Sequence, residues 1–194
     1  MNHSPEHDLE IIHFKTQKEL ERWLHKNQKK SKGIWLHFFK KNSGVKSIGW
    51  QDAVEAGLCY GWIDGQANGY DEQSWLQRFT PRRAKSSWSK KNTEHAERLI
   101  KLGRMKPAGL AEVEKAKADG RWDKAYDSPI NMKAPEDLLK ALEKNKKAKA
   151  FFESLNKTNK YAINWRLQTA KKPETRAKRM KMILEMLKKG EKFH

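Results

Sequence analysis

The hydrophobic positions in the first part of the chain follow the periods of both strands and helices. Residues 74–80 show the period of two that is typical of a strand, because Trp75 and Phe79 alternate with Arg78 and Thr80. Residues 74–80 are expected to pair with a strand at residues 62–70 as a meander. Further strands are predicted at residues 11–14, 34–39 and 62–70, and helices at residues 16–27 and 50–60.

After residue 89 the apolar positions recur only at the helical spacing of three or four. Prolines fit the starts of helices and glycines fit their ends, since proline suits a first turn and glycine a left-handed cap. The expected helix starts hold Pro107, Pro135 and Pro173, and the expected helix ends hold Gly103, Gly120 and Gly190. This region is therefore predicted to be all-helical, and Tyr161 and Trp165 share a helical face.

These patterns predict the α+β class, with a small sheet and packed helices in an N-terminal body followed by an all-helical C-terminal part. Three segments are expected. Residues 1–12 form a flexible tail, residues 13–120 form the α+β body with a Trp/Gly-rich signature, and residues 121–194 form a basic helical region. A chain of 194 residues can bury a sizeable core.

The formal charge of +18 is unevenly distributed along the chain. Residues 81–194 hold 31 Lys and Arg against 14 Asp and Glu, whereas residues 1–80 are nearly balanced. This asymmetry favours an anionic partner: nucleic acid, an acidic protein or an anionic surface. A solvated helical surface rich in lysine is the ordinary alternative, because lysine is also a good helix former.

Several classes of protein are disfavoured by what the sequence lacks. It holds no apolar run near the ~18 residues of a transmembrane helix, and its start has no signal-peptide pattern. The single cysteine excludes an intramolecular disulfide framework. Neither a phosphate-binding glycine loop nor a metal-ligand spacing appears. We therefore expect a cytoplasmic protein with no cofactor and no metal, and the oligomeric state stays open.

The stretch from Trp50 to Trp88 is the densest in unusual residues. It holds four of the eight tryptophans and the only cysteine. Aromatic rings beside cations can bind a small anion or stack on bases. We therefore place a candidate ligand site on six residues of this stretch: Trp62, Asp64, Arg78, Arg82, Arg83 and Trp88.

Two residues of this stretch have ordinary explanations as well as chemical ones. Cys59 could be a nucleophile beside a histidine, but its apolar helical neighbours favour a buried core residue. Asp64 could be a general base or ligand-binding acid, yet a turn residue is the commoner explanation. With Gly65 it could form either a tight turn or a bulge. We expect no catalytic residue.

The motifs of this stretch resemble those of the YdeI/OmpD-associated, or bacteriocin-protection, family. The resemblance rests on residues 57–65, 79–83, 87–89 and 103–109, and on residues 161–165 and 170–176 near the C-terminus. It extends over nearly the whole chain from about Phe14. It implies a role in tolerance of antimicrobial peptides or envelope stress, and an association with an envelope protein. It brings no catalytic residues.

Three hypotheses follow for the function. The first is a non-enzymatic accessory protein that acts by binding; since a chain of +18 repels cationic peptides, competition for anionic envelope sites or indirect regulation is physically easier than capture. The second is a nucleic-acid-binding accessory protein that uses the basic half, with two cationic clusters: Lys144, Lys146, Lys147 and Lys149, and Arg176, Lys178, Arg179 and Lys181. The third is a small-molecule enzyme with its site near Asp64 and Arg82.

Overall fold

The computed structural model describes residues 8–128 and 131–194 of the chain. Contacts divide these residues into two compact units. The first comprises the chain up to Ser86 together with Asn92–Asp123, and the second comprises Ser87–Lys91 and Lys124–His194. Residues 1–7, which include most of the predicted tail, lie outside the described part. Ile11 and Ile12, also assigned to that tail, belong to a strand.

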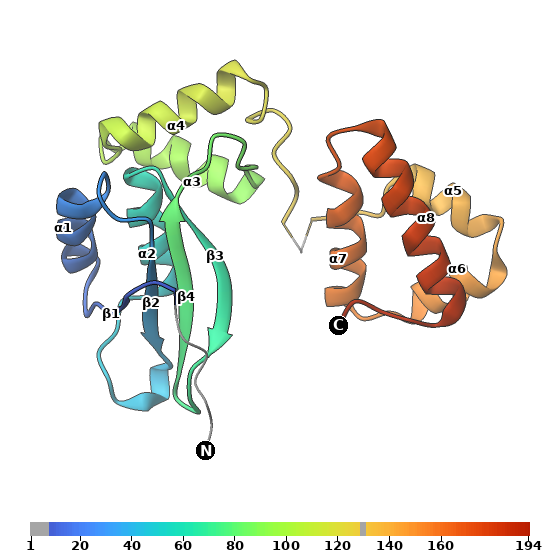
Figure 1. The fold of residues 1–194 in the computed structure, drawn as a ribbon, viewed down its shortest axis with the longest axis horizontal. Coiled ribbons are helices and arrows are strands. Elements are labelled where there is room, and N and C mark those ends of the chain that lie inside the picture. The colour runs from blue at the N-terminus through green and yellow to red at the C-terminus, as the bar shows by residue number, and fades with distance from the viewer. Residues whose placement is uncertain (1–7, 129–130) are drawn as a thin grey trace. The chain divides into compact units, whose positions relative to one another are not determined.

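The first unit contains a four-stranded mixed sheet in the order β1-β2-β4-β3 (Figure 1). The strands are β1 Ile11–His13, β2 Ile34–Phe39, β3 Trp62–Gly69 and β4 Ser74–Pro81. β1 pairs with β2 in parallel, and the other two pairings are antiparallel. The four predicted strands are thus confirmed, including the meander of β3 and β4.

The helices of this unit begin and end at the residues that the sequence marks. They are α1 Gln17–Asn27, α2 Trp50–Cys59, α3 Lys90–Lys101 (from Asn92 onward in this unit) and α4 Pro107–Ala118, with a short 3-10 turn η1 at Lys41–Ser43. The Thr16 hydroxyl caps α1 by accepting a hydrogen bond from the backbone of Glu19 (3.3 Å). The Glu19 carboxylate accepts one in turn from the backbone N–H of Lys15 (2.7 Å).

One face of the sheet forms the core of the first unit with α1 and α2. Trp62 and Phe79 are each 1% exposed. The Trp62 ring meets the Trp23 ring of α1 edge to face at 5.7 Å, and Gly57 of α2 lies against the ring of Phe79. In Figure 1, α2 lies behind the strands. Burial of these large rings is the main favourable term for this unit.

The second unit consists of helices α5 Glu136–Glu143, α6 Lys146–Ser154, α7 Lys157–Gln168 and α8 Pro173–Lys189. The segment Ser87–Lys91 joins it through backbone hydrogen bonds between Trp88, Lys90 and Tyr126. The apolar faces of the four helices enclose a core of their own: Leu138, Leu142, Ala148, Phe152, Leu155, Ile163, Leu167, Ile183 and Leu187. The predicted class, an α+β body followed by an all-helical part, is confirmed. The domain limits at residues 12 and 120 stay predictions.

Candidate functional site

The structure places Trp62 and Asp64 on the same face of β3. Trp62 is buried against α1 and belongs to the core. Asp64 is half-buried and pairs with Phe79 of β4. The strand continues through Asp64 and Gly65, and its register with β4 shifts before Ala67. Asp64 and Gly65 therefore lead into a β-bulge and do not form a tight turn. The interpretation of Asp64 as a turn residue is therefore wrong.

Arg78 lies on the opposite face of the sheet from Asp64. Asp64 pairs with Phe79, so their side chains share one face of the sheet. Arg78 precedes Phe79 in the same strand, and successive side chains of a strand point to opposite faces. The guanidinium of Arg78 donates two hydrogen bonds to the carboxylate of Asp8 (3.1 and 2.8 Å) and lies 5.7 Å from the centroid of the Trp35 ring. The hydrogen bond from Arg78 lowers the pKa of Asp8. Arg78 thus ties the start of the described chain to the sheet.

The last three predicted site residues have three different environments. Arg82 is 7% exposed, and its backbone N–H donates to the carbonyl of Gly61 (2.9 Å). Arg83 is exposed. Trp88 is 1% exposed and belongs to the second unit. The structure therefore brings Trp62 and Asp64 together on one face and places Arg78 on the other. A ligand site shared by all six residues stays a prediction.

Cys59 is a buried residue of α2, as its apolar neighbours predict. It is 2% exposed, and burial raises the pKa of its thiol to about 11. The thiol is therefore protonated at neutral pH and a poor nucleophile.

We expect the natural chain to resist alkylation at Cys59 under native conditions, since both burial and protonation protect the thiol. Mass spectrometry after iodoacetamide treatment at neutral pH would show slow modification that becomes fast in urea. Rapid modification of the folded chain would contradict this placement.

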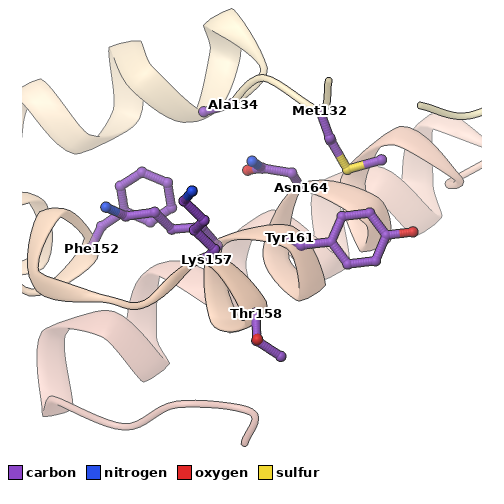
Figure 2. Close-up of a pocket in the computed structure, with 8 residues that line it drawn as sticks. Met132, Ala134, Phe152, Lys157, Thr158, Tyr161 and Asn164 are labelled. Atoms are coloured by element: carbon purple, nitrogen blue, oxygen red, sulfur yellow. The ribbon is translucent and has the colours of Figure 1, made fainter. Parts of the chain in front are cut away.

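The second unit contains a pocket of about 570 Å³ between α6, α7 and the segment before α5 (Figure 2). Its size lies in the range of small-molecule sites. Its lining combines apolar side chains, two lysines and polar groups: Met132, Ala134, Phe152, Lys157, Thr158, Lys160, Tyr161 and Asn164. The pocket was not predicted from the sequence, although Lys157, Tyr161 and Asn164 share one helical face of α7.

Asn164 is the unusual side chain of this pocket. It is 4% exposed, and its Oδ1 atom is buried without a hydrogen-bond partner among residues 8–128 and 131–194. Figure 2 shows its amide directed toward the space between Ala134, Phe152 and Lys157. Buried polar groups in proteins nearly always have partners, so this one calls for an explanation.

The remaining polar groups of the pocket differ in how firmly they are held. The Lys160 ammonium donates to the backbone carbonyl of Glu153 (2.7 Å) and lies 5.9 Å from the centroid of the Phe152 ring. Lys157 is exposed in the first turn of α7. Burial raises the pKa of Tyr161, which is therefore a neutral hydroxyl at pH 7, and in Figure 2 that hydroxyl points away from Asn164.

The cations of the second unit fall into two groups. The arginines hold the helices together: Arg176 pairs with Asp137 of α5 (2.8 Å) and donates to the carbonyl of Leu167, and Arg179 donates to the carbonyl of Arg166 (2.6 Å). Lys178 and Lys181 of the same predicted cluster are exposed. Two of its four members thus bind internal groups.

Exposed lysines occupy the first turns of two helices of this unit. α6 begins with Lys146 and Lys147, and α7 begins with Lys157, and neither first turn contains an acidic residue. The amino end of a helix carries partial positive charge, so a cation there destabilises the fold by about 0.3–1 kcal/mol. The same arrangement creates a strongly positive surface for an anion.

Within the described ranges 8–128 and 131–194, no helix is both long and apolar enough to cross a membrane. The same ranges contain no group of three or more His, Cys, Asp or Glu side chains arranged to hold a metal ion.

Comparison with known families divides the chain in a similar place. Residues 12–112, slightly more than half of the chain, match the family described as "Domain of unknown function (DUF8412)". Residues 131–190 match the family described as "Bacteriocin-protection, YdeI or OmpD-Associated". No curated protein and no solved structure matches the chain.

The second match covers the whole pocket and the lysine-bearing helix starts. It supports the resemblance to the YdeI/OmpD-associated family for the C-terminal part. The motifs between Gly57 and Gly109 lie in the other match, so the resemblance does not extend over nearly the whole chain.

Proposed function

Because this chain belongs to the family described as "Domain of unknown function (DUF8412)" and its residues 131–190 match a bacteriocin-protection family, we propose that it is a non-enzymatic accessory protein that acts by binding. Its helical unit binds an anionic surface, and this binding contributes to tolerance of antimicrobial peptides or envelope stress. The observation that carries the proposal is the lysines in the first turns of α6 and α7.

The charge of the helical unit supports an anionic partner. Residues 124–194 hold 19 Lys and Arg against 8 Asp and Glu. Lys146 and Lys147 are exposed at the positive end of α6, where they weaken the helix. Each such lysine contributes about 1 kcal/mol of attraction near a membrane that contains anionic lipids. The positions that are unfavourable for folding are thus favourable for this kind of binding.

Exposed aliphatic side chains favour a lipid surface over nucleic acid as this partner. Leu139 of α5 and Met182 of α8 are 45% and 47% exposed. Aliphatic side chains among lysines suit the boundary between headgroups and acyl chains, whereas single-stranded nucleic acid favours exposed aromatic rings for stacking. We therefore place an anionic phospholipid surface first and nucleic acid second.

Competition explains how a cationic protein could protect against cationic peptides. Capture of the peptide is opposed by charge repulsion, since the chain itself carries +18. A basic protein that occupies anionic headgroups instead reduces the sites that the peptide can use.

The test is binding to vesicles of phosphatidylglycerol and phosphatidylethanolamine, measured by co-sedimentation. We expect binding at about 10 mM salt that weakens strongly at about 150 mM, as the Debye length falls from about 30 to about 8 Å. Replacing Lys146 and Lys147 together with glutamine should weaken binding by about tenfold or more. The melting temperature should stay unchanged or rise, because the variant removes cations from the start of α6.

A matched control removes the same charge elsewhere. Lys115 and Lys117 of α4 pair with Glu112 and Glu114 (2.8 and 3.9 Å), and glutamine at both positions should leave vesicle binding nearly unchanged. Equal losses of vesicle binding in the two variants would show that net charge alone, and not the position of the lysines, drives the binding. Salt-sensitive binding to single-stranded nucleic acid without vesicle binding would replace the lipid surface by the second partner.

A further inference from the structure

We propose that the pocket of the helical unit is a binding site for a small amphipathic anion. This ligand has a flat apolar body, a hydrogen-bond donor that reaches Asn164 and an acidic group that reaches Lys157. The site shares Lys157 with the proposed anionic surface but does not include Lys146 and Lys147 of α6, so variants at those two lysines distinguish the two proposals.

The amide of Asn164 is the observation that requires a ligand. Its Oδ1 atom is a strong acceptor, it has lost its contact with bulk water, and it has no partner in the part of the chain that the structure describes. Leaving such a group unpaired is unfavourable for folding. Since the amide is directed into the pocket (Figure 2), a donor on a bound molecule would satisfy it there.

The walls of the pocket define the body of the ligand. Phe152 is 7% exposed and presents its ring with the side chains of Met132 and Ala134. Tyr161 contributes a ring whose hydroxyl points away from Asn164 (Figure 2). An apolar, flat group fits such walls, because a methionine thioether and aromatic rings make favourable contacts with another ring.

The lysines define the charge of the ligand. Lys160 is held by the carbonyl of Glu153 and sits near the Phe152 ring, so it provides a fixed positive potential. Lys157 is exposed in the first turn of α7 and lies between Phe152 and Tyr161 in Figure 2. The positive end of α7 adds to the attraction for a carboxylate, sulfonate or phosphate group.

Anilinonaphthalene sulfonate is a probe with these three features, since it joins aromatic rings, one N–H donor and one sulfonate. We expect one bound molecule per chain, measured by fluorescence enhancement and calorimetry on the full chain. Replacing Asn164 with leucine should weaken the binding by about tenfold, because the donor loses its acceptor. The melting temperature should be unchanged or higher, since the variant removes an unpaired buried acceptor.

Two further variants keep this test decisive. Phenylalanine at Ala134 fills the pocket while Asn164 itself is unchanged, and it should abolish binding. Alanine at Thr175, an exposed residue of α8 that does not line the pocket, should leave the affinity unchanged. The double variant at Lys146 and Lys147 should also bind the probe normally, which separates this site from the proposed surface. Binding that survives both the leucine and the phenylalanine substitutions, or that has several sites per chain, would overturn the proposal.

Discussion

Replacing Gly109 with alanine is expected to destabilise the first unit by about 3 kcal/mol, at the upper end for an overpacking substitution. Gly109 lies in α4, where the helix passes directly over the end of α2. An added Cβ would meet the carbonyl oxygens of Leu58, at 2.6 Å, and of Cys59. Both are backbone atoms, so neither can rotate away.

The direction of this effect distinguishes packing from helix propensity. Alanine is better than glycine inside a helix by about 1 kcal/mol, so a helix without tertiary contacts would gain stability. Here α4 is fixed at its start, because the backbone N–H of Lys106 donates to the carbonyl of Cys59 (3.0 Å). The close approach therefore cannot relax without breaking this bond.

Urea denaturation followed by circular dichroism would measure the change. Gly69 provides the matched control, because an added Cβ at this end of β3 meets no atom within 4 Å. Its alanine variant should lie within about 0.5 kcal/mol of the natural chain. If the Gly109 variant were as stable as this control, α4 would not contact α2 through its backbone.

The order of strands and helices was predictable because it depends on local chemistry. The left-handed cap at Gly190 has φ 74°, and the capping box at Thr16 satisfies free N–H groups within its own turn. Such features involve residues close in sequence. The periods of apolar residues then fix which face of each element is buried.

The partners of the charged residues were not predictable in the same way. Arg78 binds Asp8, 70 positions away, and this pairing depends on the position of β4 within the sheet. Arg176 and Lys178 look equivalent in sequence, yet only the arginine reaches Asp137. The six candidate residues are close in sequence, but strand alternation places Asp64 and Arg78 on opposite faces of the sheet, and Arg82, Arg83 and Trp88 lie beyond the end of β4.

The pocket was missed for a related reason. Its lining comes from three segments, and its distinguishing feature is a missing partner for Asn164, which no pattern in the sequence reveals. An asparagine among apolar positions of α7, close to Ile163 and Leu167, was the available signal. On the sequence alone it is indistinguishable from an exposed helical residue.

Replacing Glu55 with alanine is expected to lower the free energy of unfolding by about 2 kcal/mol. This is less than the loss of about 3–5 kcal/mol that is typical when a buried ion pair is broken. Glu55 is buried in α2, and its carboxylate pairs with Arg98 (2.5 Å) and with Arg104 (3.6 Å). The side chains of the two arginines are 46% and 34% exposed. Both can therefore turn to water after the substitution, which limits the loss of stability.

The pH dependence of this pair has a definite sign. Burial by itself would raise the pKa of Glu55, but the hydrogen bond and charge of Arg98 outweigh it and lower the pKa below its usual value. The stabilisation is therefore present above the unfolded pKa of about 4.3 and is lost as the pH falls through the lower folded value. The stability difference between the natural chain and a Glu55→Gln variant should be large at neutral pH and shrink toward pH of about 3.

Urea denaturation of both chains at the two pH values measures this difference. Glu114 supplies the control, because it is 71% exposed and pairs only loosely with Lys117 (3.9 Å). Its glutamine variant should match the natural chain at either pH, as exposed pairs contribute little. A constant difference for the Glu55 variant across the same pH range would show that packing, and not the charge on Glu55, stabilises the contact of α2 with Arg98.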